Sequence, residues 1–285
     1  MKTNLFKYSI SFISLIIFLI VYLSIAGIET EKFNQQIKDK VIQSNKDLRI
    51  DLKKVKLTLD PLKLSINAKT IDATLYYINR PIELEYIKTK VSLDSILKNK
   101  LVSSNFEIAT KSIVLKDFVQ FVRSVTFRPE LLILETIIKD GKINLDLNLN
   151  FDQNGKIKND YKINGKLEET KIKFLKDFNF EKINFLFHLK NKSFLLKNIN
   201  FTAANVNFNS DLIRIIKFGN SYKVEGKIEN SKSILPNNIF RLLNLNLENI
   251  DFEETIFSSK NSFIFDIDKK FKFKNLKLES KINFN

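Results

Sequence analysis

Few residues of this chain could carry acid–base or metal chemistry. His188 is the only histidine and cysteine is absent, so the usual zinc ligand sets cannot be assembled. The spacing of Asp266 and Asp268 puts them on one strand face, and paired carboxylates can do acid–base work on sugars. That face is the polar one, and His188 has the parity of Asn184, opposite the neighbouring phenylalanines. We therefore expect all three side chains to face solvent.

Known catalytic motifs are also missing from the sequence. No GxSxG, P-loop, GxGxxG or HExxH occurs, and the six glycines are too scattered to cradle a phosphate. The adjacent glutamates at 168–169 and at 253–254 would point to opposite sides of their strands. We expect a protein without enzymatic activity, cofactor or metal.

The segments that hold these residues alternate between apolar and polar side chains. From Gly141 to Glu169, apolar residues alternate with Asn, Asp, Lys and Glu, and the pattern returns further along the chain. A period of two indicates strands with one apolar and one polar face. The apolar parity gives candidate residues for a lipid groove: Ile143, Leu145, Leu147, Leu149, Phe151, Ile157, Tyr161, Ile163, Gly165, Leu167, Ile183, Phe185, Phe187, Leu189, Val224, Gly226, Ile228, Phe263, Phe265 and Ile267.

The expected fold is mainly β. Apolar stripes predict a helix at Thr30–Asn45 and another that begins at Pro129 and is ended by Gly141. From Gly141 onward the pattern is almost wholly that of strands, some of about 12 residues against a usual five or six. We expect an N-terminal transmembrane helix, then a long antiparallel curved sheet that forms an open groove, with a few short helices.

The N-terminus decides the compartment. Residues 10–28 form an uncharged apolar run of 19 residues. As a helix it would be about 28 Å long, close to the hydrocarbon thickness of a bilayer. Lys2 and Lys7 precede it and two glutamates follow, which predicts a cytoplasmic N-terminus and export of the remaining chain. A cleaved signal peptide is the alternative, because residues 24–26 resemble a cleavage site, although the run exceeds the roughly 7–15 residues of a signal peptide's apolar core.

The composition limits the partners. The formal net charge is +15, but the lysines are spread singly along the strands. A solvated sheet face explains such spacing, and attraction to anionic lipid headgroups is the alternative. Export argues against a nucleic-acid partner, and the absence of cysteine fits an oxidising compartment.

A weak internal repeat places glycine on the apolar parity. The segment YKINGKLEE at 161–169 returns as YKVEGKIEN at 222–230. Gly165 and Gly226 occupy matching positions on the side where bulky residues are expected. Glycine there permits bending, close approach or a bulge.

A closed sandwich is the ordinary way to hide an apolar sheet face. Long strands, few turns, almost no helix after residue 141 and 26 phenylalanines favour an open trough instead. Acyl chains could fill such a trough, because burying hydrocarbon gains about 0.8 kcal/mol per CH₂ without fixing a register. The hypothesis from the residues alone is a lipid-binding β-groove.

Four segments resemble the AsmA-like superfamily of Gram-negative envelope proteins. They are the apolar run at 10–28, the strand pair at 48–71, the strand–helix–strand segment at 82–115 and the alternating region at 140–167. The resemblance implies a curved β-groove of the bridge-like lipid transfer type, reaching from the inner membrane into the periplasm. It implies no catalytic residues, and because many members are far longer, it implies a fragment or a chain that acts with partners.

The resulting prediction is a single-pass inner-membrane protein in three parts. These are a cytoplasmic tip and anchor at 1–28, an α+β module at 29–140 and an extended β-groove at 141–285. The chain would bind or conduct phospholipid in the periplasm and so contribute to envelope lipid homeostasis. The alternative is a structural or assembly factor that binds other envelope proteins through a sheet edge; an envelope hydrolase is a third, weaker reading. The lipid species, direction and energy source of transfer and the oligomeric state do not follow from the sequence.

Overall fold

The fold is mainly β, as the alternation predicts. The computed structural model describes residues 2–44, 46–92, 105–126, 129–150, 158–175, 178–191, 193–219, 221–236, 255–268 and 272–284. Its strands form one antiparallel sheet of 16 strands, ordered by hydrogen bonding as β1-β3-β4-β6-β7-β9 and onward in sequence to β16. The chain falls into two compact units, residues 1–111 with 147–158, and residues 112–146 with 159–285.

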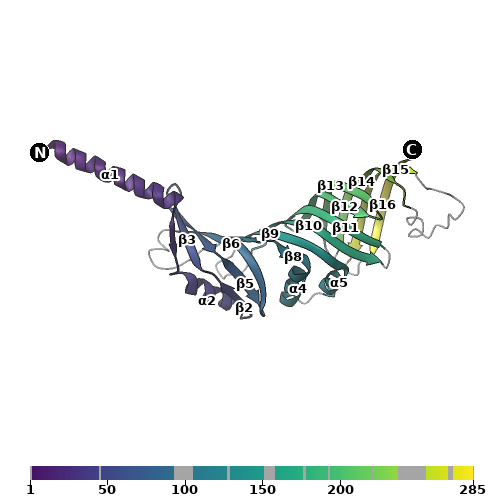
Figure 1. The fold of residues 1–285 in the computed structure, drawn as a ribbon, viewed down its shortest axis with the longest axis horizontal. Coiled ribbons are helices and arrows are strands. Elements are labelled where there is room, and N and C mark those ends of the chain that lie inside the picture. The colour runs from purple at the N-terminus through teal and green to yellow at the C-terminus, as the bar shows by residue number, and fades with distance from the viewer. Residues whose placement is uncertain are drawn as a thin grey trace. The chain divides into compact units, whose positions relative to one another are not determined.

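The described part of the first unit combines a long and a short helix with seven strands and the end of an eighth (Figure 1). The strand pair expected at 48–71 becomes three strands, because its first member is divided in two between Asp51 and Lys54. The elements are α1 (Lys2–Ile25), β1 (Ile28–Thr30), α2 (Asn34–Ser44), β2 (Leu48–Asp51), β3 (Lys54–Asp60), β4 (Ser65–Ile71), β5 (Ala73–Tyr77), β6 (Arg80–Ser92) and β7 (Asn105–Thr110).

The core of the first unit lies between α2 and the sheet. Helix α2 contacts β2, and Phe33, just before the helix, is buried with Ile50 and Val55. Asp72, with a φ of 50°, separates β4 from β5 and pairs with Lys53 at 2.9 Å. The hydrogen bond from Lys53, with its positive charge, lowers the pKa of Asp72, and the same hydrogen bond raises the pKa of Lys53.

The N-terminal apolar run forms helix α1, which has 24 residues and contacts β3 at its end. Across the segments that the structure describes, no helix combines the length and apolarity needed to cross a membrane. The structure therefore does not support the transmembrane part of the expected fold.

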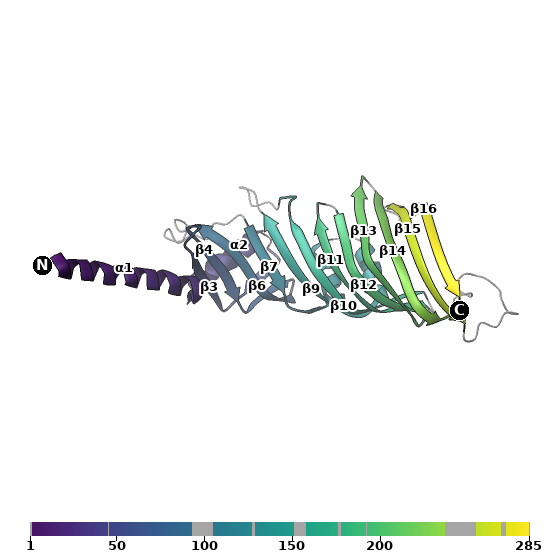
Figure 2. The same ribbon diagram turned by 90° about the horizontal axis from the view of Figure 1, so that it is seen from above.

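The second unit is built from long strands. Strands β9 to β16 have 11 to 14 residues each, which confirms the long strands expected from the sequence. They lie side by side in sequence order (Figure 2), and β10 to β16 pair in antiparallel fashion, each with the next. The elements are β8 (Ile113–Val114), α4 (Leu115–Val125), α5 (Pro129–Ile137), β9 (Ile138–Asn150), β10 (Lys162–Leu175), β11 (Phe178–Lys190), β12 (Ser193–Ala203), β13 (Val206–Phe218), β14 (Ser221–Ile234), β15 (Ile256–Asp268) and β16 (Phe273–Phe284).

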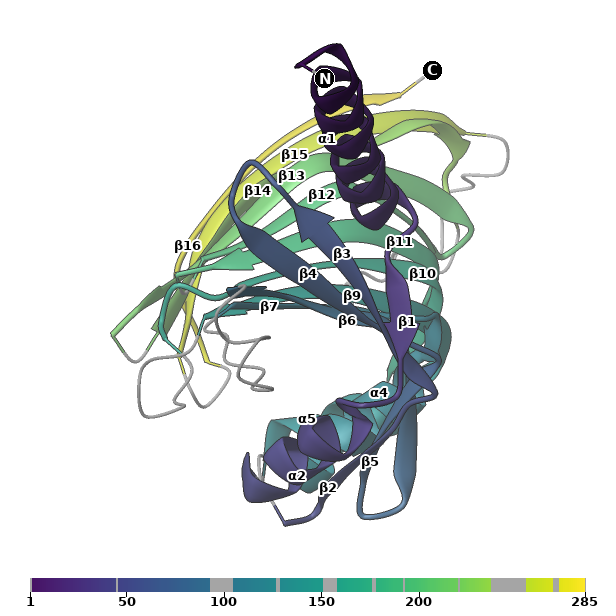
Figure 3. The same ribbon diagram turned by 90° about the vertical axis from the view of Figure 1, so that its left-hand side faces the viewer.

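Two helices pack at the beginning of this unit. Helix α4 contacts β8 and α5 contacts β10, while Leu115 and Val119 of α4 are buried. The helices are joined by Glu135, which pairs with Arg123 at 2.8 Å and accepts a hydrogen bond of 2.8 Å from Gln120. Beyond the helices, strands β10 to β15 bend along their length (Figure 3).

The expected end of the second helix is wrong. Helix α5 ends at Ile137, and β9 begins at Ile138 without an intervening loop. Gly141 is therefore a strand residue, not a helix cap. Its φ of 131° lies in the region that favours glycine, and a Cβ there would lie 2.9 Å from the Cα of Thr170 on β10. The glycine thus allows β9 and β10 to approach closely.

Some sequence expectations lie outside the described residues. These are the groove candidates Phe151 and Ile157 and the middle part of the strand–helix–strand segment at 82–115, residues 93–104. The two compact units also divide the chain differently from the three expected parts, because the end of β9 belongs to the first unit and its beginning to the second.

Candidate functional site

One side of the second unit carries continuous rows of apolar side chains. Residues directly opposite one another on antiparallel strands point to the same side of the sheet. The pairing register therefore joins residues from β10 to β16 into a row. This row consists of Gly165, Phe187, Leu196, Ile213, Gly226, Phe263 and Leu278. A second row, from β10 to β15, consists of Ile163, Leu189, Phe194, Ile215, Val224 and Phe265.

These two rows define the apolar face. Leu167 lies opposite Phe185 beside the first row, and Ile267 lies opposite Tyr222 beside the second. Val224 and Leu167 are buried, whereas most other members are half-buried. Strands β11 to β16 have their main contacts with the strands beside them. The side chains of the two rows are therefore partly covered by one another and not by a second described layer. The described strands thus present hydrocarbon on one side of a single sheet.

The remaining groove candidates take other positions. Ile143 and Leu145 are buried on β9, close to the two helices, and Ile183 is buried on β11. Leu147 and Leu149 are half-buried in the part of β9 that belongs to the first unit. Two further candidates, Tyr161 and Ile228, are half-buried, just before β10 and on β14 respectively.

Each repeat glycine on the apolar face lies under a phenylalanine ring. A Cβ on Gly165 would overlap the ring of Phe187, and a Cβ on Gly226 would lie 2.9 Å from Cζ of Phe263. In both pairs the phenylalanine is directly opposite the glycine on the next strand. The glycine leaves the space that the ring fills, which is the pairing described as aromatic rescue of glycine. The repeat in the sequence thus becomes a repeated glycine–phenyl contact.

Phenylalanines also cluster beyond the predicted positions. The rings of Phe180 and Phe208 lie 5.7 Å and 5.3 Å from the ring of Phe201, measured between centroids. A second group joins Phe265 to Phe263 at 5.8 Å and to Phe273 at 5.3 Å. The first group and Phe273 lie outside the groove candidates, whereas Phe263 and Phe265 are among them.

A polar network interrupts the apolar side of β14 and β15. Ser259 donates a hydrogen bond of 2.6 Å to Oδ1 of Asn230, and both side chains are buried. Asn261 donates to Ser259 at 2.9 Å. Because these groups satisfy one another, they can stay buried without a partner from outside. Beyond the network, apolar side chains resume on β15 at Phe257, which is buried and lies opposite Phe284.

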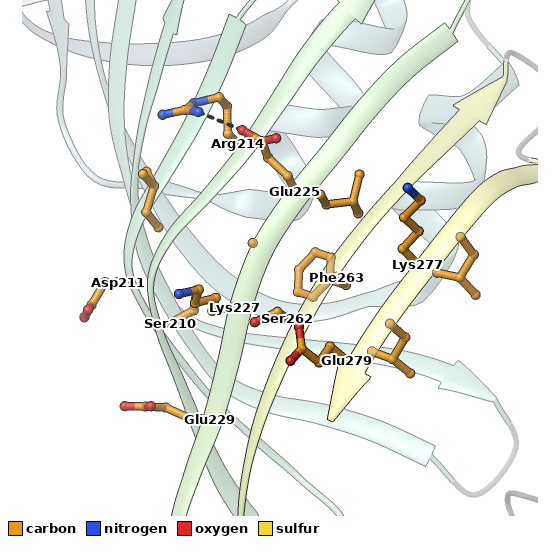
Figure 4. Close-up of a pocket in the computed structure, with 15 residues that line it drawn as sticks. Ser210, Asp211, Arg214, Glu225, Lys227, Glu229, Ser262, Phe263, Lys277 and Glu279 are labelled. Atoms are coloured by element: carbon orange, nitrogen blue, oxygen red, sulfur yellow. Dashed lines mark hydrogen bonds and ion pairs between the residues drawn. The ribbon is translucent and has the colours of Figure 1, made fainter. Parts of the chain in front are cut away.

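An open hollow of about 850 Å³ lies over β13 to β16 (Figure 4). Two groove candidates, Gly226 and Phe263, line it, together with charged residues of both signs. Arg214 donates a hydrogen bond of 2.7 Å to Glu225, and the two alternate with residues of the apolar rows. Its charged lining consists of Asp211, Arg214, Glu225, Lys227, Glu229, Lys277 and Glu279.

The residues considered for acid–base chemistry make separate contacts. His188 is exposed, as predicted. Asp266 accepts a hydrogen bond of 2.7 Å from Asn275, and Asp268 pairs with Lys274 at 3.4 Å. The two carboxylates thus tie the end of β15 to the start of β16. Within the described segments, no group of three or more His, Asp and Glu side chains is placed to hold a metal ion.

The fold and the apolar face define the structural class of this protein. It is a protein with a single, open, antiparallel sheet whose apolar rows lie on one side. The chain matches no family model, no curated protein and no solved structure.

Proposed function

We propose that this chain is a membrane-anchored, AsmA-like periplasmic protein that binds or conducts phospholipid along its apolar face. The observation that carries the proposal is the pair of apolar rows on β10 to β16, which no second described layer covers. A sheet that leaves so much hydrocarbon open must bury it against another molecule or lose solubility.

Acyl chains suit this face better than a peptide does. The face offers isoleucine, leucine, valine and phenylalanine, and its members make their contacts without directional groups. Ten methylenes buried against it would gain about 8 kcal/mol, at about 0.8 kcal/mol each. Because hydrophobic contacts fix no register, a bound tail would be retained across the sheet yet free to slide along it.

The other side of the same strands carries charged residues. Lys166, Lys190 and Lys223 are exposed, and their positions alternate with those of apolar-face residues. A tail on one side of the sheet and water on the other would leave both surfaces satisfied. Such an arrangement supports a role in lipid homeostasis of the cell envelope.

The direct test is the mass of the purified chain. The full chain should be extracted from membranes in a mild detergent and examined by native mass spectrometry. We expect phospholipid adducts at a stoichiometry of one or more per chain, which survive exchange into lipid-free detergent. A chain that is folded yet free of lipid directly after extraction would refute the proposal.

We propose further that α1 is the membrane anchor, with its N-terminus in the cytoplasm. This proposal is supported by the exposed apolar side chains around the helix, among them Phe12, Leu15 and Phe18, each more than 60% exposed. After alkaline carbonate extraction, the chain should stay in the membrane pellet. Placing lysine at both Leu15 and Phe18 should release it, because a charge within hydrocarbon costs about 2.5–3.5 kcal/mol. Release of the unsubstituted chain would contradict the anchor.

The alternative function, an envelope assembly factor, is favoured by one observation. Strand β16 stands at the end of the strand order and all its residues are exposed. An exposed strand edge is a ready template for pairing with another chain.

A further inference from the structure

Strand β16 differs from the strands before it in the exposure of its apolar side chains. Phe273, Leu276 and Leu278 are 62–65% exposed, whereas Phe263 and Phe265 on the neighbouring β15 are half-buried. The difference arises because, among the described strands, β16 pairs with β15 and with no further strand. Its apolar side chains therefore have packing neighbours on one side only.

Apolar and polar residues alternate along the end of β16, and this pattern can pair with an antiparallel copy of itself. Leu278 lies opposite Phe263 and so belongs to the apolar face, with Leu276, Ile282 and Phe284 on the same parity. The residues between them point to the other side. This polar set consists of Lys277, Glu279, Lys281 and Asn283.

We propose that β16 pairs in antiparallel fashion with β16 of a second copy of this chain, with Ser280 at the two-fold axis. In this register Leu278 lies opposite Ile282 of the second copy, and Leu276 opposite Phe284 of the second copy. On the other side of the sheet, Glu279 lies opposite Lys281 of the second copy. Each of these pairs occurs twice, because the two-fold axis makes the interface isologous.

Other two-fold registers are poorer. Centring the pair on Glu279 would put the two Glu279 side chains together and oppose Lys277 to Lys281 of the second copy. Centring it on Leu278 would place Leu276 opposite a serine and run into Asn275, where a φ of 53° and a register shift disturb the strand. A slip of one residue would join the apolar side of one copy to the polar side of the other. The Leu278 register would also oppose Lys277 to Glu279, but it gives one apolar pair, Leu278 with Leu278. The Ser280 register gives four apolar pairs beside its two ion pairs and is therefore the better one.

The pairing would also remove the exposed edge. Strand edges with open hydrogen-bonding groups are usually protected, and lysines are a common device for that protection. In the two-fold register Lys281 faces Glu279 of the second copy and forms a cross-strand ion pair, while Lys277 faces Asn283, so neither lysine repels the partner strand. The apolar rows of the two copies would then be continuous across the axis. The pairing does not depend on which molecule the apolar face binds.

Cysteine cross-linking at the axis tests the register. The chain has no cysteine, so Ser280→Cys introduces a single thiol at an exposed position. Residues directly opposite on paired strands have Cβ atoms about 4.5–5.5 Å apart, near the span of a disulfide. In the full chain in mild detergent, oxidation should convert most of the Ser280→Cys protein to a covalent dimer.

Leu276→Cys is the matched control on the same strand. In the proposed register the thiol at position 276 faces position 284 of the second copy. The thiol of the second copy lies eight residues further along that strand, about 26 Å away, so this variant should not be cross-linked. Equal cross-linking of both variants, or cross-linking of neither, would overturn the proposal.

Charge exchange gives a second readout without cysteine. Glu279→Lys should weaken the dimer about tenfold or more in detergent sedimentation, because like charges would face each other across the axis. Adding Lys281→Glu should restore the affinity to within about threefold, because each pair is then opposite in sign again. A single substitution without effect, or a double variant as weak as the single one, would contradict the register.

Discussion

Replacing Ile215 with aspartate is expected to remove phospholipid from the purified chain, whereas the same change at Ile216 leaves it bound. Ile215 lies in the middle of the apolar face, opposite Phe194 on β12 and Val224 on β14. Ile216 is the next residue and points to the other side of the sheet, where it is 38% exposed. The two variants therefore carry the same chemical change on the same strand, one residue apart.

The physical reason is the cost of a carboxylate within hydrocarbon. A charge against an acyl chain has no hydrogen-bonding partner there, so the ion keeps its water and the tail loses its contact. A loss of even 1.4 kcal/mol lowers binding tenfold, and we expect Ile215→Asp to lower lipid occupancy by at least that factor. Occupancy is measured by native mass spectrometry of each variant after identical extraction.

Folding must be measured beside lipid binding in both variants. Far-ultraviolet circular dichroism should show the same strand content in the two proteins, because neither side chain is fully buried. If Ile215→Asp unfolds the chain while Ile216→Asp does not, the face is an ordinary protein core. If both variants keep their lipid, the lipid lies elsewhere.

The sequence predicts which strands exist and which side of some of them is apolar, but not how the sides join. On β14, and on β10 up to Leu167, the alternation is clean, and most residues predicted on these strands lie opposite apolar partners, although Ile228 lies opposite Asn261. On β12 and β13 apolar residues stand on both sides, as at Leu195 and Leu196, or Ile215 and Ile216. Where apolar residues stand on both sides of a strand, the sequence does not show which of them belong to the apolar face. On β12 and β13 only the pairing register identifies these residues.

Bulges explain most of the other differences. Glu169, Lys182 and Asn198 have φ values of 47° to 52°, and the register with a neighbouring strand shifts beside each of them. At such a residue the alternation slips by one position. Thr170 is therefore fully buried, although counting by twos from Leu167 would point it to solvent. An asparagine or a charged residue in a long strand is a weak signal for a bulge, because the same residues also fill ordinary solvent-facing positions.

The two repeat glycines look equivalent in the sequence but should respond differently to alanine. At Gly226 the added Cβ would meet Cγ1 of Ile213 at 2.8 Å and Cζ of Phe263 at 2.9 Å, both of which belong to side chains that can turn away. At Gly165 it would meet the ring of Phe187 and also lie 2.8 Å from the backbone oxygen of Asn144, which cannot. Overpacking costs about 1–3 kcal/mol, so we expect Gly165→Ala near the upper limit and Gly226→Ala near the lower.

A second substitution distinguishes the cost of contact with the phenylalanine ring from the cost of contact with the backbone oxygen. In a Phe263→Leu background, the cost of Gly226→Ala should fall, because the ring tip is gone and the remaining close atom, Cγ1 of Ile213, belongs to a side chain that can turn away. In a Phe187→Leu background, Gly165→Ala should still lower the free energy of unfolding by about 1 kcal/mol, since the oxygen of Asn144 remains in place. The measurement is the denaturant midpoint at constant slope, for each single variant and each pair. Full recovery of Gly165→Ala by Phe187→Leu would show that β9 can move away from β10, and that the close strand approach at Gly165 is not a fixed feature of the sheet.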